Sequence, residues 1–169
     1  KLLRSLGHSC TRLRPTLVQL KSDWKGAAAL KGVRANCRAA IVHNGDVTAE
    51  SEGQLQFTEY GLSGPVIFEI SRDVCQSGGD WLCRLDFLPE MDEEILISEL
   101  KKRRNTALPV SELLTGILHN RLGRVLTQTA GLTSNALVNS LSDREFSQAA
   151  QAVKRLEVSL TEPMGMDCA

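Results

Sequence analysis

The sequence has no apolar run that approaches the roughly 20 residues a membrane-spanning helix needs. Its start, KLLRSLGHSC, lacks the apolar core of a secretory signal peptide. The formal net charge is zero, from 20 basic and 20 acidic residues, so no overall field attracts nucleic acid or an anionic membrane. We therefore expect a cytoplasmic protein with no membrane partner, for which nucleic acid is an unfavoured partner.

The motifs of common catalytic and cofactor sites are also absent. There is no GxxxxGK[ST] phosphate loop, no GxGxxG dinucleotide loop and no GxSxG nucleophile turn. The histidines His8, His43 and His119 form no HxxxH or HExxH pattern, so we expect no metal site. The five cysteines form no CxxC pair, which favours reduced thiols over disulfides or zinc. An independent small enzyme with catalytic residues of its own is the least favoured hypothesis.

What is present in the first half is a series of strand patterns. Residues 33–42 alternate, with Val33, Cys37 and Ile41 on one face, which is typical of a half-buried strand. Asn44-Gly45 then supplies the positive φ angles of a tight hairpin. The predicted extended segments are 11–20, 33–42, 47–51, 54–58, 65–70 and 81–88. Short strands at hairpin spacing favour a small antiparallel barrel over a βαβ sheet.

After Pro89 the apolar period becomes helical. A first helix begins near Met91, with acidic residues in its first turn and KKRR (101–104) in its last. A second, longer helix is predicted from Val110 to Leu126. Ser142 and Glu145 form a capping box that opens a third helix.

The period reverts to two at Leu156, so the chain closes with a strand. The predicted fold class is therefore α+β: a small antiparallel β-barrel with an inserted all-helical subdomain. The barrel takes residues 1–90 and is completed by a final strand within 156–169, and the helical subdomain takes residues 91–155.

The KKRR run supports an alternative hypothesis, a protein- or nucleic-acid-interaction module that acts through the helical subdomain. Against nucleic acid stand the zero net charge, the lack of a second cationic cluster on the following helix, and the usual preference of cations for a helix C-terminus.

The stretch FTEYGLSGP (57–65) contains the most unusual local sequence. Gly61 and Gly64 permit backbone conformations or close approaches that other residues do not, and Pro65 fits the start of a strand. We expect a turn at the rim of the barrel. Whether it touches a ligand or is only a packed corner stays open from the residues alone.

Three stretches carry a family resemblance: RSLGHSCTRLRPTLVQL, FTEYGLSGPVIFEISR and TEPMGMDCA. Together they resemble the middle part of the NAD(P)/FAD-dependent oxidoreductases of the BaiN/YhiN type, and the resemblance covers essentially the whole chain. It implies a β-barrel plus helical insert whose partner is the parent's own Rossmann-type FAD domain. The chain starts at Lys1 without a methionine, and we expect it to be an excised insert that binds no FAD and is inactive alone.

The resemblance also implies which residues face the flavin or substrate in the parent enzyme. They are Arg14, Thr58, Glu59, Gly61, Leu62, Ser63 and Gly64. The sequence departs from the family pattern at Glu59-Tyr60, where a His-Phe pair is usual, so any role of that histidine is in doubt here. Arg14 is equally suited to a salt bridge that holds two domains together. In the parent, the insert is expected to shape the substrate side of the flavin cleft.

Overall fold

The structure is a computed structural model that describes residues 2–9, 14–76 and 80–165. Six strands form a closed antiparallel barrel in the order β1-β4-β3-β2-β5-β6. Their bounds are β1 Leu20–Ser22, β2 Arg34–His43, β3 Asp46–Thr58, β4 Gly61–Ser63, β5 Trp81–Asp86 and β6 Leu156–Pro163. The predicted fold class, α+β with an antiparallel barrel, is confirmed.

The barrel forms where alternating residues bury one face. Along β2, Cys37, Ala39 and Ile41 are buried as predicted, and β5 buries Trp81, Cys83 and Leu85. The hairpin between β2 and β3 turns at Asn44 and Gly45, whose φ angles are 53° and 92°. These paired positive values are those of the predicted tight turn. The two strands predicted at 47–51 and 54–58 form one continuous strand, β3.

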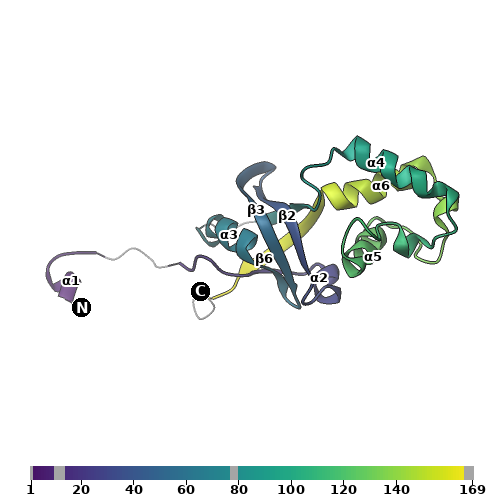
Figure 1. Cartoon of the computed structure of the whole chain (residues 1–169). Coiled ribbons are helices and arrows are strands. Elements are labelled where there is room, and N and C mark those ends of the chain that lie inside the picture. Colours follow the sequence, from purple (N-terminus) through teal and green to yellow (C-terminus); the bar gives the residue numbers. More distant parts are fainter. Residues whose placement is uncertain (1, 10–13, 77–79, 166–169) are drawn as a thin grey trace.

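The helices between β5 and β6 lie together beside the barrel, while the end of β6 points to its opposite side (Figure 1). The α-helices of the chain are α1 Leu2–Ser5, α2 Lys25–Ala29, α3 Pro65–Gln76, α4 Glu93–Lys102, α5 Asn120–Thr129 and α6 Asp143–Lys154. Short 3₁₀ turns occupy Arg103–Asn105, Val110–Glu112 and Val138–Ser140. The division into units at residues 90 and 155 stays a prediction.

The prediction of a strand at residues 65–70 is wrong, because this segment forms the first half of helix α3. Pro65 occupies the first helical position, where its missing N–H costs nothing. The buried residues Val66, Ile67, Ile70 and Val74 recur at helical spacing and pack against the barrel. A short apolar run such as VIFEI fits both the period of a strand and the period of a helix, so the apolar pattern alone did not distinguish the two structures.

The single helix predicted from Val110 to Leu126 is also wrong. A 3₁₀ turn at Val110–Glu112 is followed by irregular chain, and α5 begins only at Asn120. Gly116 has a φ of 80°, which interrupts the helix, and His119 caps α5 by accepting a hydrogen bond from the Arg121 N–H. The expected apolar positions Leu113, Leu114 and Leu122 are nevertheless buried.

Other local predictions agree with the structure, apart from the extended segment 11–20. Ser142 and Glu145 form the predicted capping box at the start of α6. In the 11–20 segment, strand β1 starts only at Leu20, and residues 11–13 lie outside the described part of the chain. The stretch SGGD (77–80) is typical of a turn, but its residues 77–79 lie outside the described part of the chain. No helix among the described residues is long and apolar enough to cross a membrane.

Candidate functional site

The corner of FTEYGLSGP is built by two glycines that lie against the chain's own backbone. Gly61 has a φ of 150°, and a Cβ placed there would lie 2.3 Å from the Leu20 carbonyl oxygen. Gly64 has a φ of 98°, and its Cβ would lie 2.6 Å from the Gln54 carbonyl oxygen. Both positions therefore require glycine for close packing of strands β1, β3 and β4.

The residues between these glycines are buried. Leu62 is fully buried in the barrel, and Ser63 is 6% exposed. Pro65 starts helix α3 rather than the strand we predicted. The close approaches of Gly61 and Gly64 are thus filled by protein, and neither glycine leaves a cradle for a bound phosphate.

Thr58, Glu59 and Tyr60 form the exposed turn that joins β3 to β4. The Thr58 hydroxyl donates a hydrogen bond to the Gly61 carbonyl oxygen at 3.2 Å, which closes the turn. Glu59 forms an ion pair with Lys31, a residue of the loop that follows α2. Tyr60, the next residue along the chain, is exposed and interacts electrostatically with the same carboxylate.

These contacts change the ionisation of all three groups. The hydrogen bond from Lys31 and the interaction with Tyr60 lower the pKa of the Glu59 carboxyl. Its hydrogen bond to Glu59 raises the pKa of the Lys31 ammonium, and the interaction with Glu59 raises the pKa of the Tyr60 phenol. At neutral pH Lys31 and Glu59 are therefore charged and Tyr60 is neutral.

A hollow of about 320 Å³ lies beside this turn, a size within the range of small-molecule sites. It is lined by Gln19, Lys31, Gly32, Gln56, Phe57, Thr58, Glu59 and Tyr60. Lys31 and Gln19 were not among the site residues predicted from the sequence, because they lie far along the chain from Glu59 and belong to no recognised motif. Only closure of the barrel brings them together.

Arg14 lies apart from the corner. Its guanidinium donates a hydrogen bond to the Cys75 carbonyl oxygen at 3.3 Å, near the C-terminal end of α3. Gly64 directly precedes the other end of this helix of 12 residues. The structure thus brings Thr58 and Glu59 together with the glycines, and it places Arg14 at the far end of α3.

The cysteines and histidines that the structure describes offer no alternative centre. Burial raises the pKa of the Cys37 thiol to about 12 and raises that of Cys83 as well, so both are unreactive thiols inside the barrel. His43 stacks on Trp81 with ring centroids 4.0 Å apart, and His119 caps α5. Within residues 2–9, 14–76 and 80–165, no group of three or more His, Cys, Asp or Glu side chains is placed to hold a metal ion.

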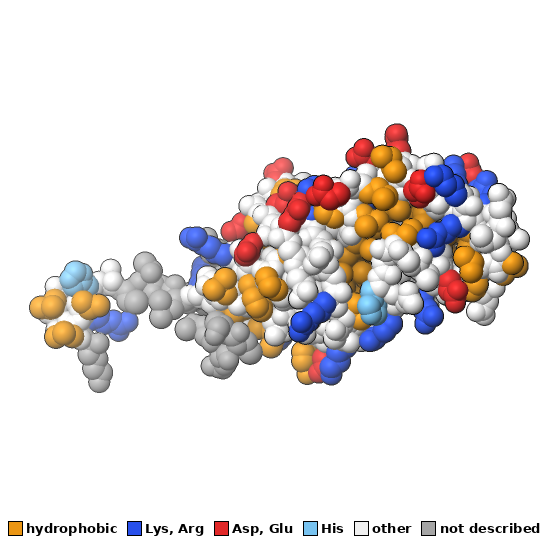
Figure 2. Space-filling view, in the orientation of Figure 1, with side chains coloured by type: hydrophobic (Ala, Val, Ile, Leu, Met, Phe, Trp, Pro, Cys, Tyr) orange, Lys and Arg blue, Asp and Glu red, His pale blue; other side chains and the backbone are white. Residues whose placement is uncertain are grey.

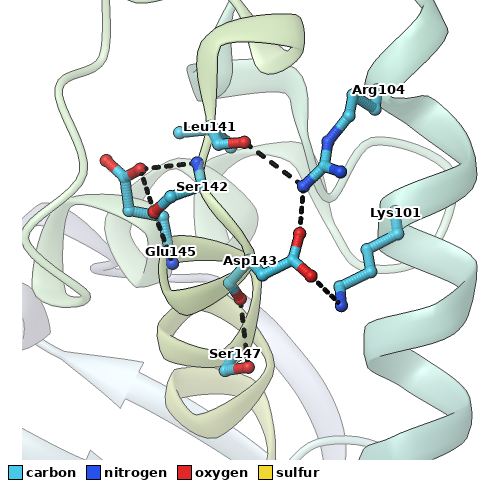
Figure 3. Close-up of polar contacts among 7 residues, drawn as sticks. All are labelled: Lys101, Arg104, Leu141, Ser142, Asp143, Glu145 and Ser147. Carbon is cyan, nitrogen blue, oxygen red and sulfur yellow. Dashed lines mark hydrogen bonds and ion pairs between the residues drawn. The ribbon is translucent and has the colours of Figure 1, made fainter.

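The KKRR cations all have partners within the chain. Lys101 and Arg104 both bind the Asp143 carboxylate (Figure 3). Arg104 also lies over the Phe146 ring. Lys102 pairs with Glu99. On the face shown in Figure 2, acidic and basic side chains are interspersed over the helices that follow the barrel.

Arg103 holds the irregular segment that precedes α5. Its guanidinium donates to the carbonyl oxygens of Leu113 and Thr115 at 2.9 and 2.8 Å. The basic run therefore stabilises the helical part of the chain, and this gives it a structural role that does not depend on nucleic acid.

The Asp143 contacts predict a dependence of stability on acid. Hydrogen bonds from Lys101 and Arg104 lower the pKa of Asp143 to about 2, below the value of roughly 4 in an unfolded chain. Asp143 therefore stabilises the fold above about pH 4, and this contribution is lost as the pH falls toward about 2.

We expect Asp143→Asn to lower the urea midpoint near neutral pH and to match the wild type near pH 2. Asp46→Asn is the control, because Asp46 is exposed and has no ion pair among the residues that the structure describes. A gap between Asp143→Asn and wild type that stays constant across this pH range would contradict the assignment.

Comparison with known proteins identifies the class. Residues 14–169 match the family model described as HI0933-like protein barrel and H2TH domain. The chain therefore belongs to the HI0933-like family, as its resemblance to the BaiN/YhiN type predicted.

A curated relative is the 3-dehydro-bile acid delta(4,6)-reductase of Clostridium scindens (strain ATCC 35704 / DSM 5676 / VPI 13733 / 19). It is 32% identical over 175 residues, and the alignment covers 98% of this chain. The chain spans only 42% of the length of that reductase.

Proposed function

We propose that this chain is the substrate-side domain of a flavin-dependent reductase. FAD is held by a Rossmann-type domain that the remaining sequence of the parent forms. Family membership and the name of the relative, a reductase, support this proposal. More than half of that relative lies outside the matched region, which leaves room for such a domain.

The observation that carries the proposal is the position of Gln19. Its carbonyl oxygen accepts a hydrogen bond from the Met164 N–H at 2.9 Å, so the segments that enter and leave the barrel run side by side. Gln19 also lines the hollow beside Thr58 and Glu59. A domain that connects to both segments would lie next to this hollow and form the opposite wall of a cleft.

In this proposal the predicted site residues have different roles. Thr58 and Glu59 face the cleft, and the buried sequence Gly61, Leu62, Ser63 and Gly64 supports the turn that presents them. Arg14, on the segment that enters the barrel, lies near the flanking domain and contributes to the interface rather than to the substrate site.

The described residues of this chain do not themselves fit a flavin. The glycine corner is filled by the backbone of Leu20 and Gln54, and the sequence contains no dinucleotide loop. We therefore assign FAD binding to the flanking sequence, and we derive no catalytic step through the cofactor from this chain.

The test is a titration of the purified chain with FAD, followed by flavin fluorescence and by the melting temperature. We expect no quenching of flavin fluorescence and no shift in melting temperature, whereas the full-length protein purifies with bound flavin. Saturable FAD binding by the isolated chain would overturn the assignment of FAD binding to the flanking sequence. A flavin-free full-length protein that also fails to bind added FAD would overturn the proposed function.

A further inference from the structure

Lys31 is a charged side chain at the hollow that has unused hydrogen-bond donors. Its ammonium group donates to Glu59, and no other hydrogen bond of that nitrogen is found among the described residues. A protonated lysine has further N–H groups available after one such bond. The side chain is 63% exposed, so these donors are accessible from the hollow.

One ion pair holds the Lys31 ammonium in place, because the Glu59 carboxylate binds it directly. Tyr60, the next residue along the chain, interacts with the same carboxylate and lines the same hollow.

The remaining lining of the hollow is uncharged. It consists of Gln19, Gly32, Gln56, Phe57 and Thr58. Because the charges of Lys31 and Glu59 balance each other, the hollow offers no net charge to an ionic ligand. Its chemistry suits an uncharged molecule with an oxygen acceptor that meets the ammonium, while amide and hydroxyl groups contact the rest.

We propose that Lys31 binds the carbonyl oxygen of an uncharged, ketone-bearing substrate, with Glu59 as its positioning residue. This inference rests on the proposed function, which makes the hollow part of a substrate cleft. The 3-dehydro group in the name of the relative is a ketone, which agrees with the group proposed to meet Lys31, and the acid group of a bile acid lies outside this proposed contact. No bond is made or broken in this step, since Lys31 acts only as a hydrogen-bond donor.

The test measures the affinity of the flavin-loaded full-length protein for an uncharged 3-oxo-4-ene steroid by titration calorimetry. We expect Lys31→Met to weaken binding about 10- to 100-fold, the usual effect of losing a charge-assisted hydrogen bond. Lys31→Arg keeps most of the affinity because it keeps a charged donor. Lys102→Met, which removes a similarly exposed lysine paired with Glu99 on α4, leaves it unchanged.

The positioning role has a separate optical readout, because Tyr60 is the only tyrosine of the chain. The ultraviolet absorbance of tyrosinate in the purified chain therefore reports the pKa of Tyr60 alone. We expect this pKa to lie above the ordinary value and to fall in Glu59→Gln, which removes the negative charge beside the phenol. A pKa that does not change in Glu59→Gln would overturn the positioning role of Glu59.

Failure of this inference and failure of the proposed function give different experimental results. If the full-length protein holds flavin and Lys31→Met binds the steroid as tightly as wild type, the role of Lys31 is wrong while the function stands. If the full-length protein binds no flavin, the proposed function is wrong. This inference rests on that function and would be overturned together with it.

Discussion

Gly61→Ala is expected to destabilise the fold by about 3 to 5 kcal/mol, as the sum of backbone strain and overpacking. At a φ of 150° an L side chain is strained, and its Cβ would lie 2.3 Å from the Leu20 carbonyl oxygen. This oxygen belongs to the backbone of strand β1, so a change of rotamer cannot relieve the contact. The measurement is the urea dependence of unfolding, followed by tryptophan fluorescence.

Gly45→Ala is the matched control for this prediction. Gly45 also has a positive φ, 92°, but a Cβ there would meet nothing within 4 Å. We expect a cost of about 1 to 2 kcal/mol, from backbone conformation alone. Equal losses in the two variants would show that the approach to Leu20 is not tight, and the structural account of the corner would then fail.

Lys154→Met is expected to cost about 3 kcal/mol, because it removes one partner of a largely buried ion pair. The ammonium of Lys154, at the end of α6, lies 2.7 Å from the Asp86 carboxylate and donates to the Leu88 carbonyl oxygen at 2.5 Å. The two charged side chains are only 12% and 18% exposed. The Phe87 N–H also donates to the Val153 carbonyl oxygen at 3.0 Å.

These contacts join the segment that leaves the barrel after β5 to the segment that returns at β6. Their loss should loosen the attachment of the helices, which limited proteolysis between residues 87 and 92 would detect. Lys102→Met, which breaks the exposed pair with Glu99, should change the free energy of unfolding by less than about 1 kcal/mol.

A double-mutant cycle separates the pair from its surroundings. Because Lys154→Met leaves the Asp86 charge without its partner, adding Asp86→Asn should cost less than the sum of the two single changes. Strictly additive losses would mean that Asp86 and Lys154 do not interact in solution.

Local sequence was enough to predict elements whose pattern fits one period only. Strand β2, the Asn44-Gly45 turn and strand β6 followed from alternation and turn chemistry, and α6 followed from its capping box. Helix α3 was missed because VIFEI satisfies either period. The break before α5 was missed because apolar spacing continues through Gly116, whose positive φ does not appear in the sequence.

The candidate site could be predicted only in part from the sequence, for a related reason. Gly61 and Gly64 stood out as residues that permit unusual backbone conformations, and Glu59-Tyr60 stood out as a departure from the family pattern. Lys31 did not, since its role depends on Glu59, which lies 28 positions away. Isolated lysines are common on protein surfaces, and nothing in the neighbouring residues marks this one.

The amino-acid sequence by itself determined the family, the α+β class with its antiparallel barrel and the position of the glycine corner, because these depend on composition, period and short motifs. The tertiary structure decided which groups meet: Lys31 with Glu59, Gly61 with Leu20, and Lys154 with Asp86. Closure of the barrel and return of the chain at β6 set these contacts between residues distant in sequence, and no local pattern encodes them.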